Sequence, residues 1–218
     1  MCGRFSFAPN EKIIEERFSV KAGLDLFVPR YNCAPTQKLA VISNDVPDDL
    51  SFYRWGLIPF WSKDASAGSK MINTKAETIS EKPSFKKSFN SKRCLVLTDG
   101  FYEWKKEGKI KTPYYFYLKN HTPFAFAGIW DEWKDAEGKP LRTFSIITTS
   151  ANNLMKPIHE RMPVILKREE EREWLSINNS QTLLQLLKPY SSAEMQLHAV
   201  SALVNSPFND RPELIDHV

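Results

Sequence analysis

Hydrophobic and polar positions alternate in short runs over most of the chain, and these runs are rich in β-branched and aromatic residues. Both features are typical of β-strands. The pattern predicts strands at residues 38–43, 50–58, 94–98, 101–104, 114–118, 124–130, 143–149, 161–166 and 196–200. Several of these runs follow one another with only a short turn between them, as expected for antiparallel neighbours.

A few stretches have helical spacing instead. Residues 10–19 begin with Asn10, which can cap a first turn, and Pro83 suits the first turn of a second helix. Residues 167–175 and 182–187 are amphipathic. Because the strands do not alternate strictly with helices, the pattern predicts an α+β fold, in which a mainly antiparallel, curled, barrel-like sheet has flanking helices.

Composition narrows this picture to one ordinary globular unit. The chain has 218 residues, of which 42% are hydrophobic and 26% charged, and no stretch rich in Gly, Ser or Pro divides it. We therefore expect a single domain over residues 1–218. It has neither a membrane-length apolar run nor a secretory signal, so we expect a cytoplasmic protein without a membrane partner. Its cysteines are widely spaced, which predicts free thiols, no metal site and no cofactor.

The charge distribution singles out one segment. Residues 61–93 hold eight lysines and arginines against three acidic residues. Trp55, Phe60 and Trp61 come just before or at the start of this segment. Basic groups beside aromatic rings are typical of a surface that binds single-stranded nucleic acid. A solvated lysine-rich loop beside core aromatics has the same pattern, so charge alone leaves both interpretations open.

Cys2 has a chemical property that no internal cysteine shares. Its side chain is small, so removal of Met1 is expected, and Cys2 would then carry a free α-amine beside its thiol. Such amines titrate near about 7.7–8.0 and thiols near about 8.5. The amine can attack an aldehyde to give a Schiff base, and the thiol can then close a thiazolidine ring. A small buried cysteine without chemistry is the alternative.

Other polar residues lie in segments that look like turns or strand ends. Asn73 could orient an oxygen or polarise an imine, although it could also be a turn residue. Glu103 stands between two aromatic residues, where burial would suit it to proton transfer, although an exposed glutamate is more common. His159 could exchange protons near neutral pH, or serve only as a structural hydrogen-bonding group. Arg4 is two residues from Cys2.

Six segments in order along the chain carry a family resemblance. They are Met1-Cys2-Gly3-Arg4-Phe5, Arg30-Tyr31-Asn32-Cys33-Ala34-Pro35, Trp55-Gly56-Leu57-Ile58-Pro59, Asn73-Thr74-Lys75-Ala76-Glu77-Thr78, Asp99-Gly100-Phe101-Tyr102-Glu103-Trp104 and His159-Glu160-Arg161-Met162-Pro163. With them the chain resembles the SRAP family, the SOS response-associated peptidases or abasic-site processing proteins. The segments span nearly the whole chain, so the resemblance implies one SRAP domain with the SRAP fold.

The resemblance also implies roles for individual residues. Cys2 is the implied nucleophile, Asn73 and Glu103 assist at the reacting centre, and His159 serves in proton transfer. The implied DNA groove is lined by Arg4, Asn32, Pro35, Trp61, Lys75, Lys82 and Arg161. Many relatives carry arginine where this chain has Lys75, and a lysine neutralises a phosphate without holding it in a bidentate contact.

These inferences combine into one hypothesis. The amine of Cys2 attacks C1′ of an abasic nucleotide in single-stranded DNA, Glu103 moves protons, Asn73 holds the reacting atoms in line, and His159 assists ring opening or stabilises the Schiff base. The thiol closes a thiazolidine that protects the strand from β-elimination in the DNA damage (SOS) response. Removal of Met1 can be self-catalysed, which would explain the peptidase name. We expect a monomer without a metal.

Two other function classes fit the same residues. One is a cysteine hydrolase of the N-terminal-nucleophile kind, which would cut amides with Cys2 and form no DNA adduct. The other is a binding module for single-stranded nucleic acid that keeps Met1. The covalent product distinguishes the three classes.

Overall fold

The computed structural model describes residues 2–218, and Met1, whose removal the sequence predicts, lies outside them. The first half contains β1 (Arg4–Phe7), α1 (Glu11–Phe18), β2 (Arg30–Cys33), β3 (Lys38–Ser43), β4 (Val46–Trp55), β5 (Asn73–Lys75), α2 (Pro83–Ser91), β6 (Arg93–Thr98) and β7 (Gly100–Glu107). The second half contains β8 (Ile110–Leu118), β9 (Phe124–Lys134), β10 (Pro140–Ser150), β11 (Arg161–Pro163), β12 (Ile165–Leu166), α3 (Arg168–Ser176), α4 (Ser180–Leu186) and β13 (Met195–Ala199).

The first sheet closes into a barrel. Strands β10, β4, β3, β6 and β9 pair in that order, and β9 pairs with β10 to complete the circle. All of these ladders are antiparallel except β4–β10, which is parallel. β5 and β11 extend the barrel along β10, while β12 extends it along β9. The predicted α+β class and barrel-like sheet are therefore confirmed.

The second sheet is antiparallel and carries the N-terminus. Its order is β13, β8, β7, β1 and β2. Arg4 pairs with Tyr102, so continuing the register places Gly3 opposite Glu103. The pairing of β1 with β7 thus brings the first residues of the chain to the predicted acid.

Aromatic packing holds the two sheets together. The ring of Phe5 on β1 lies 5.2 Å from Trp55 on β4 and 5.9 Å from Phe126 on β9, measured between centroids. All three side chains are buried in one cluster that also contains Cys2. Burial of each ring contributes about 1.5–3 kcal/mol to stability. The predicted nucleophile is thus built into a rigid core.

The Asp99-Gly100 pair leads the chain from the barrel into the second sheet. The Asp99 carboxylate accepts hydrogen bonds from the Ser6 hydroxyl and, at 2.7 Å, from the Ala8 amide. A Cβ at Gly100 would lie 2.2 Å from the Tyr115 side chain, so only glycine fits at this position. These contacts fix β1 against β7, and therefore Cys2 against Glu103.

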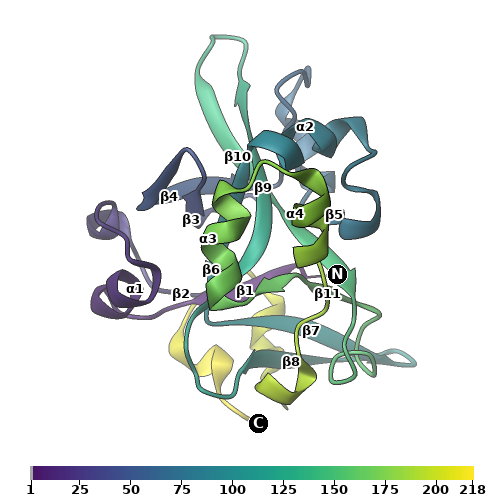
Figure 1. The fold of residues 1–218 in the computed structure, drawn as a ribbon. Helices are drawn as coiled ribbons and strands as arrows, with labels where there is room; N and C mark the ends of the chain where they lie inside the picture. Colours follow the sequence, from purple (N-terminus) through teal and green to yellow (C-terminus); the bar gives the residue numbers. More distant parts are fainter. Residues whose placement is uncertain (1) are drawn as a thin grey trace.

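The helices follow the predictions closely. The Asn10 side chain accepts a hydrogen bond from the Ile13 amide at 2.9 Å, which caps α1. Pro83 opens α2. Figure 1 shows α3 and α4 side by side in front of the barrel, and Trp174 of α3 is fully buried there.

Several strand boundaries differ from the prediction. β7, β8, β9 and β10 extend three or four residues beyond the predicted runs, and the short strands β1, β2 and β5 were not predicted. The run at 161–166 forms two strands, because the chain passes from β10 to β9 at Val164. Pro163 pairs with Thr148 of β10, Ile165 pairs with Phe126 of β9, and Val164 bonds to one residue of each strand. The run at 50–58 begins earlier and ends at Trp55, because Gly56 turns the chain with a φ of +118°.

Candidate functional site

Cys2 is fully buried and fixed through its backbone. Its carbonyl oxygen accepts a hydrogen bond from Nδ2 of Asn73 at 2.8 Å. Its sulfur lies 3.9 Å from the carbonyl oxygen of Arg4. Burial raises the pKa of the Cys2 thiol, and the nearby Glu103 carboxylate raises it further. The thiol is therefore protonated at neutral pH.

Asn73 is held at the edge of the barrel. It is the first residue of β5, which pairs in parallel with β10 opposite Ile146. The preceding carbonyl, that of Ile72, accepts a hydrogen bond from the Trp55 indole at 2.9 Å. While Nδ2 of Asn73 is bonded to Cys2, its Oδ1 is buried with no hydrogen-bond partner within residues 2–218. That oxygen is a buried acceptor on the side chain that holds the Cys2 carbonyl.

Glu103 lies on β7 and is only 3% exposed. This burial was the less common of the two outcomes left open by the sequence. Its carboxylate is close enough to influence the titration of the Cys2 thiol.

His159 lies in the loop between β10 and β11. Its Nδ1 accepts a hydrogen bond from the backbone amide of Arg161 at 2.9 Å. In the neutral ring this bond assigns the proton to Nε2. The side chain is half-buried.

One open cleft brings His159 and Glu103 together. It has a volume of about 500 Å³ and is lined by Glu103, Trp104, Lys106, Lys111, His159 and Asn205. Sequence reasoning named Glu103 and His159 but missed the two lysines and Asn205. The available signal was the run Trp104-Lys105-Lys106 that directly follows the predicted acid.

Arg4 and Asn32 hold the segment that forms one wall of this cleft. Nη1 of Arg4 donates to the Val204 carbonyl at 2.7 Å and to Oδ1 of Asn32 at 2.9 Å. The Asn32 amide donates to the carbonyls of Val204, Ser206 and Asn209. Asn32 was predicted to line a DNA groove, but it has no exposed surface, so it can shape the groove only through the segment it holds.

Arg161 is also largely enclosed. Its guanidinium donates to both carboxylate oxygens of Glu77, at 2.6 and 2.9 Å, and to the Thr148 carbonyl at 2.6 Å. Its side chain is 12% exposed, whereas that of Glu77 is 51% exposed. The pair joins two of the six sequence segments, and it supports the backbone amide that orients His159.

We expect Glu77→Gln to lower the free energy of unfolding at pH 7 by about 1 kcal/mol, because the pair is partly exposed. The Arg161 hydrogen bonds lower the pKa of Glu77. The pair therefore stabilises the fold above the ordinary pKa of glutamate, and this contribution disappears as the pH falls through the lowered value. Thermal unfolding from pH 7 down to pH 3.5 should show the two proteins converging in acid.

Glu81→Gln is the matched control, because Glu81 is exposed and close in sequence. It should leave stability within about 0.5 kcal/mol of wild type. A difference between Glu77→Gln and wild type that grows in acid would contradict the assignment.

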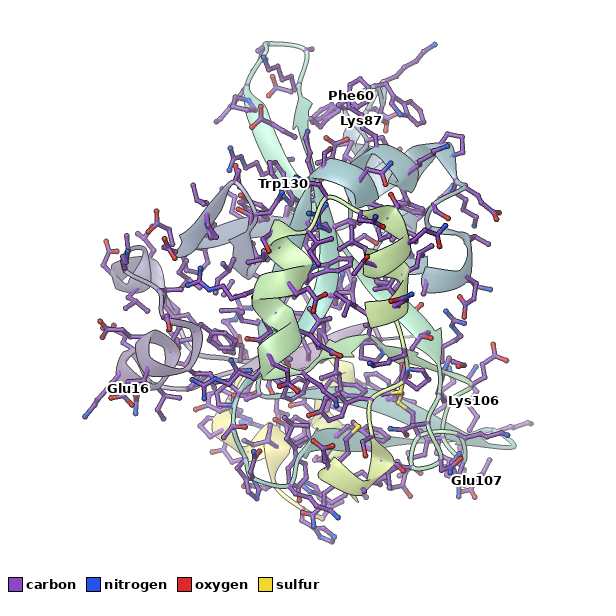
Figure 2. The ribbon with its side chains drawn as sticks, viewed as in Figure 1. Glu16, Phe60, Lys87, Lys106, Glu107 and Trp130 are labelled. Atoms are coloured by element: carbon purple, nitrogen blue, oxygen red, sulfur yellow. The ribbon has the colours of Figure 1, made fainter. Side chains whose placement is uncertain are left out.

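The remaining predicted DNA contacts lie on the surface. Lys75 and Lys82 are exposed, Pro35 is half-buried, and Trp61 is 56% exposed. Phe60, labelled in Figure 2, lies beneath the Lys87 ammonium, with 4.0 Å between the nitrogen and the ring centroid. An aromatic group beside cations is thus present at the surface, while Trp55 belongs to the core.

Within residues 2–218, no group of three or more His, Cys, Asp or Glu side chains is arranged to hold a metal ion. No helix in the described part of the chain has the length and apolar content needed to cross a bilayer.

Comparison with known proteins gives consistent results over the full length. The family described as SOS response associated peptidase (SRAP) matches residues 1–207. Abasic site processing protein YoqW of Bacillus subtilis is 49% identical, with 99% of each chain covered. Abasic site processing protein YoaM of the same organism is 46% identical, with 99% of this chain and 98% of that protein covered. A crystal structure of a protein from Bacteroides thetaiotaomicron is similar, with a TM-score of 0.90, 32% identity and complete coverage of both chains.

Proposed function

The chain belongs to the SRAP family, and from that premise we propose that it captures abasic sites in single-stranded DNA as a covalent cross-link through Cys2. The observation that carries the proposal is the hydrogen bond from Asn73 to the Cys2 carbonyl, together with the burial of Glu103 beside the same residue. Groups that can position an amine and move its protons thus surround the one residue able to form a thiazolidine.

The proposed reaction is a condensation that releases one water. Hydrolysis of the Met1–Cys2 bond converts the Cys2 nitrogen into an amine. This amine adds to C1′ of the ring-opened sugar, and the carbinolamine loses water to give a Schiff base. The sulfur then bonds to C1′ while its proton passes to nitrogen. The ring closure consumes the imine, so the electron withdrawal that promotes β-elimination of the strand is removed.

Glu103 and Asn73 act on the amine in this scheme. Oδ1 of Asn73 accepts an N–H of the amine and aims its lone pair at C1′, since this oxygen is a buried acceptor near Cys2. Glu103 takes the proton released on addition and returns it to the departing hydroxyl. We extend the proposal to self-removal of Met1, in which the same carboxylate would activate water against the peptide bond.

His159 acts on the sugar from the opposite side of the reacting carbon. With Nδ1 bonded to the Arg161 amide, the neutral ring carries its proton on Nε2, and we assign this N–H as the donor to the ring oxygen of the abasic sugar. Donation to that oxygen favours the ring-opened aldehyde, which is the reactive form. The surrounding DNA strand would follow Arg4, Pro35, Trp61, Lys75, Lys82 and Arg161, with Asn32 acting through the wall that it braces.

The state of the thiol favours this scheme over a cysteine hydrolase. Hydrolases of that kind attack with a thiolate, whose pKa is lowered by neighbouring cations. Here burial and Glu103 raise the pKa of the Cys2 thiol. A neutral thiol is a poor first nucleophile, whereas an adjacent amine can react first and deliver the carbon to the sulfur.

The test is the intact mass of the denatured protein after incubation with abasic single-stranded DNA. We expect a stoichiometric adduct whose mass is that of the chain without Met1, plus the oligonucleotide, minus one water. An undamaged oligonucleotide of the same sequence is the control and should add no mass. Retention of Met1, or turnover of a peptide substrate without a DNA adduct, would contradict the proposal.

A further inference from the structure

Two lysines outside the predicted site face each other across the cleft-forming hairpin. Lys106 on β7 pairs directly with Lys111 on β8, and both side chains line the cleft that contains Glu103 and His159. Figure 2 labels Lys106 and Glu107 toward the end of this hairpin. Like charges at directly opposed positions of an antiparallel ladder destabilise the pairing. The arrangement therefore calls for a negative charge between them.

The described protein does not supply that charge. Neither Lys106 nor Lys111 forms an ion pair within residues 2–218. By contrast, Lys105, the neighbour of Lys106, is bonded to Glu107 with 2.8 Å between nitrogen and oxygen. The unpaired lysines are thus those that line the cleft, and an anionic ligand is the natural counter-ion for them.

We propose that Lys106 and Lys111 form a phosphate-binding pair that holds one backbone phosphate of the DNA strand next to the abasic nucleotide. The inference rests on the function proposed above and adds a binding site to it. Lys106 is three residues beyond Glu103 on the same strand, a rise of roughly 10 Å. Side chains alternate between the two faces of a strand, so Lys106 lies on the face of Trp104, and the long lysine side chain reaches the cleft from there. The phosphate assigned to the pair is therefore that of a nucleotide that flanks the reacting sugar.

The wall of the cleft that faces the two lysines is held by hydrogen bonds, so a DNA strand in the cleft is confined. The Trp104 indole donates to Oδ1 of Asn205 at 2.7 Å, and Nη2 of Arg4 donates to the Asn205 carbonyl at 3.1 Å. The phosphate would therefore lie between a braced wall and two long, adaptable cations. Lysine suits this task because it binds phosphate as a point charge without demanding one geometry.

The first experiment measures non-covalent affinity for single-stranded DNA that contains a tetrahydrofuran abasic analogue, which has no aldehyde. We expect Lys106→Gln combined with Lys111→Gln to weaken binding on the order of tenfold, the equivalent of one charge-assisted contact. The slope of log affinity against log salt should fall by about 0.7, as for one lost phosphate contact on a single strand. Lys106→Arg combined with Lys111→Arg should retain wild-type binding.

The matched control removes two lysines from another hairpin. Lys134 and Lys139 are exposed near the tip of the β9–β10 hairpin, which Figure 1 shows at the opposite end of the molecule from β7 and β8. Lys134→Gln combined with Lys139→Gln removes the same charge and should leave the salt slope unchanged. Equal losses in the two double variants would mean that net charge alone is responsible, and would overturn the proposal.

The second experiment identifies the phosphate. Each phosphate around the analogue is replaced in turn by a neutral methylphosphonate. At one position that flanks the analogue, this replacement should lower the affinity of the wild type about tenfold. The same replacement should not lower the affinity of the Lys106→Gln, Lys111→Gln double variant any further. If no phosphate position shows this coupling, the inference is overturned. Displacement of the wild-type complex by inorganic phosphate at fixed ionic strength would assign the pair to another ligand and would also overturn it.

These outcomes are distinguishable from failure of the proposed function. If the intact-mass experiment yields no adduct with the wild type, the covalent function fails. If the adduct forms but the lysine variants bind like their controls, only the phosphate site fails.

Discussion

Cys2→Ser should abolish the heat-stable adduct with abasic single-stranded DNA. Serine at this position keeps the α-amine after removal of Met1, so a Schiff base still forms, but the hydroxyl closes a much less stable ring than the thiol does. We expect no adduct to survive heating unless borohydride is added first, and a covalent product once borohydride has reduced the imine. Denaturing gel analysis with and without borohydride distinguishes the two cases.

Cys33→Ala is the control for this experiment. Cys33 is a buried thiol like Cys2, but its nitrogen lies in an internal amide, so it cannot form a thiazolidine. The control should yield the heat-stable adduct in full, even if its fold is less stable. A heat-stable adduct with Cys2→Ser in the absence of borohydride would mean that the thiol is not part of the final linkage.

Glu103→Gln should slow cross-linking by about 100-fold, the lower end of the usual contribution of a positioned acid or base. Glutamine has the same shape, so the buried position on β7 stays filled and the cleft is preserved. The amide cannot accept a proton from the amine or return one to the leaving hydroxyl. The measurement is the single-turnover rate at saturating abasic DNA, with affinity for the tetrahydrofuran analogue measured in parallel.

Glu107→Gln is the matched variant, because Glu107 ends the same strand but is exposed and is not part of the cleft. It should react at the wild-type rate. The assignment of Glu103 is contradicted if its variant reacts at the wild-type rate. It is also contradicted if the slow reaction is explained entirely by weaker binding of the analogue, because Glu103 would then be a positioning residue only.

Local sequence patterns predicted which helices and strands form better than they predicted how the strands pair. Asn10 and Pro83 locate the starts of α1 and α2, and the amphipathic runs locate α3 and α4 within two residues, because these signals come from neighbouring positions. The alternating runs locate the centres of the longer strands, but β4, β7, β8, β9 and β10 begin or end three or four residues beyond them, and the short β1, β2 and β5 were not predicted. Closure of the barrel depends on the parallel ladder between β4 and β10, whose partners Trp55 and Phe144 are far apart in sequence. No local pattern specifies such a pairing. The division of the run at 161–166 into two strands was not predicted either. It arises because Pro163 pairs with β10 and Ile165 with β9, and the local pattern does not show which strand each residue bonds.

For the candidate site, likewise, the sequence predicted several of the residues but not the contacts between them. Cys2 could be singled out from its position, and Asn73, Glu103 and His159 from the motifs around them. The structure adds that Asn73 bonds to Cys2 and that Glu103 is buried beside it. The resemblance implied that Asn32 lines the DNA groove, whereas it is buried and its amide donates to three backbone carbonyls in the interior. Lys106 and Lys111 escaped notice because lysines on a strand look like an ordinary solvated face.

The central claim is that the nitrogen and the sulfur of Cys2 both bond to one sugar carbon. Trypsin releases the peptide Cys2–Arg4 from the cross-linked protein, and nuclease digestion leaves the sugar attached to it. The decisive measurement is the mass of this peptide after borohydride and iodoacetamide treatment. The account predicts peptide plus sugar minus one water, with no added hydrogen and no alkylated thiol. Two added hydrogens with an alkylated sulfur would show an open imine and contradict it.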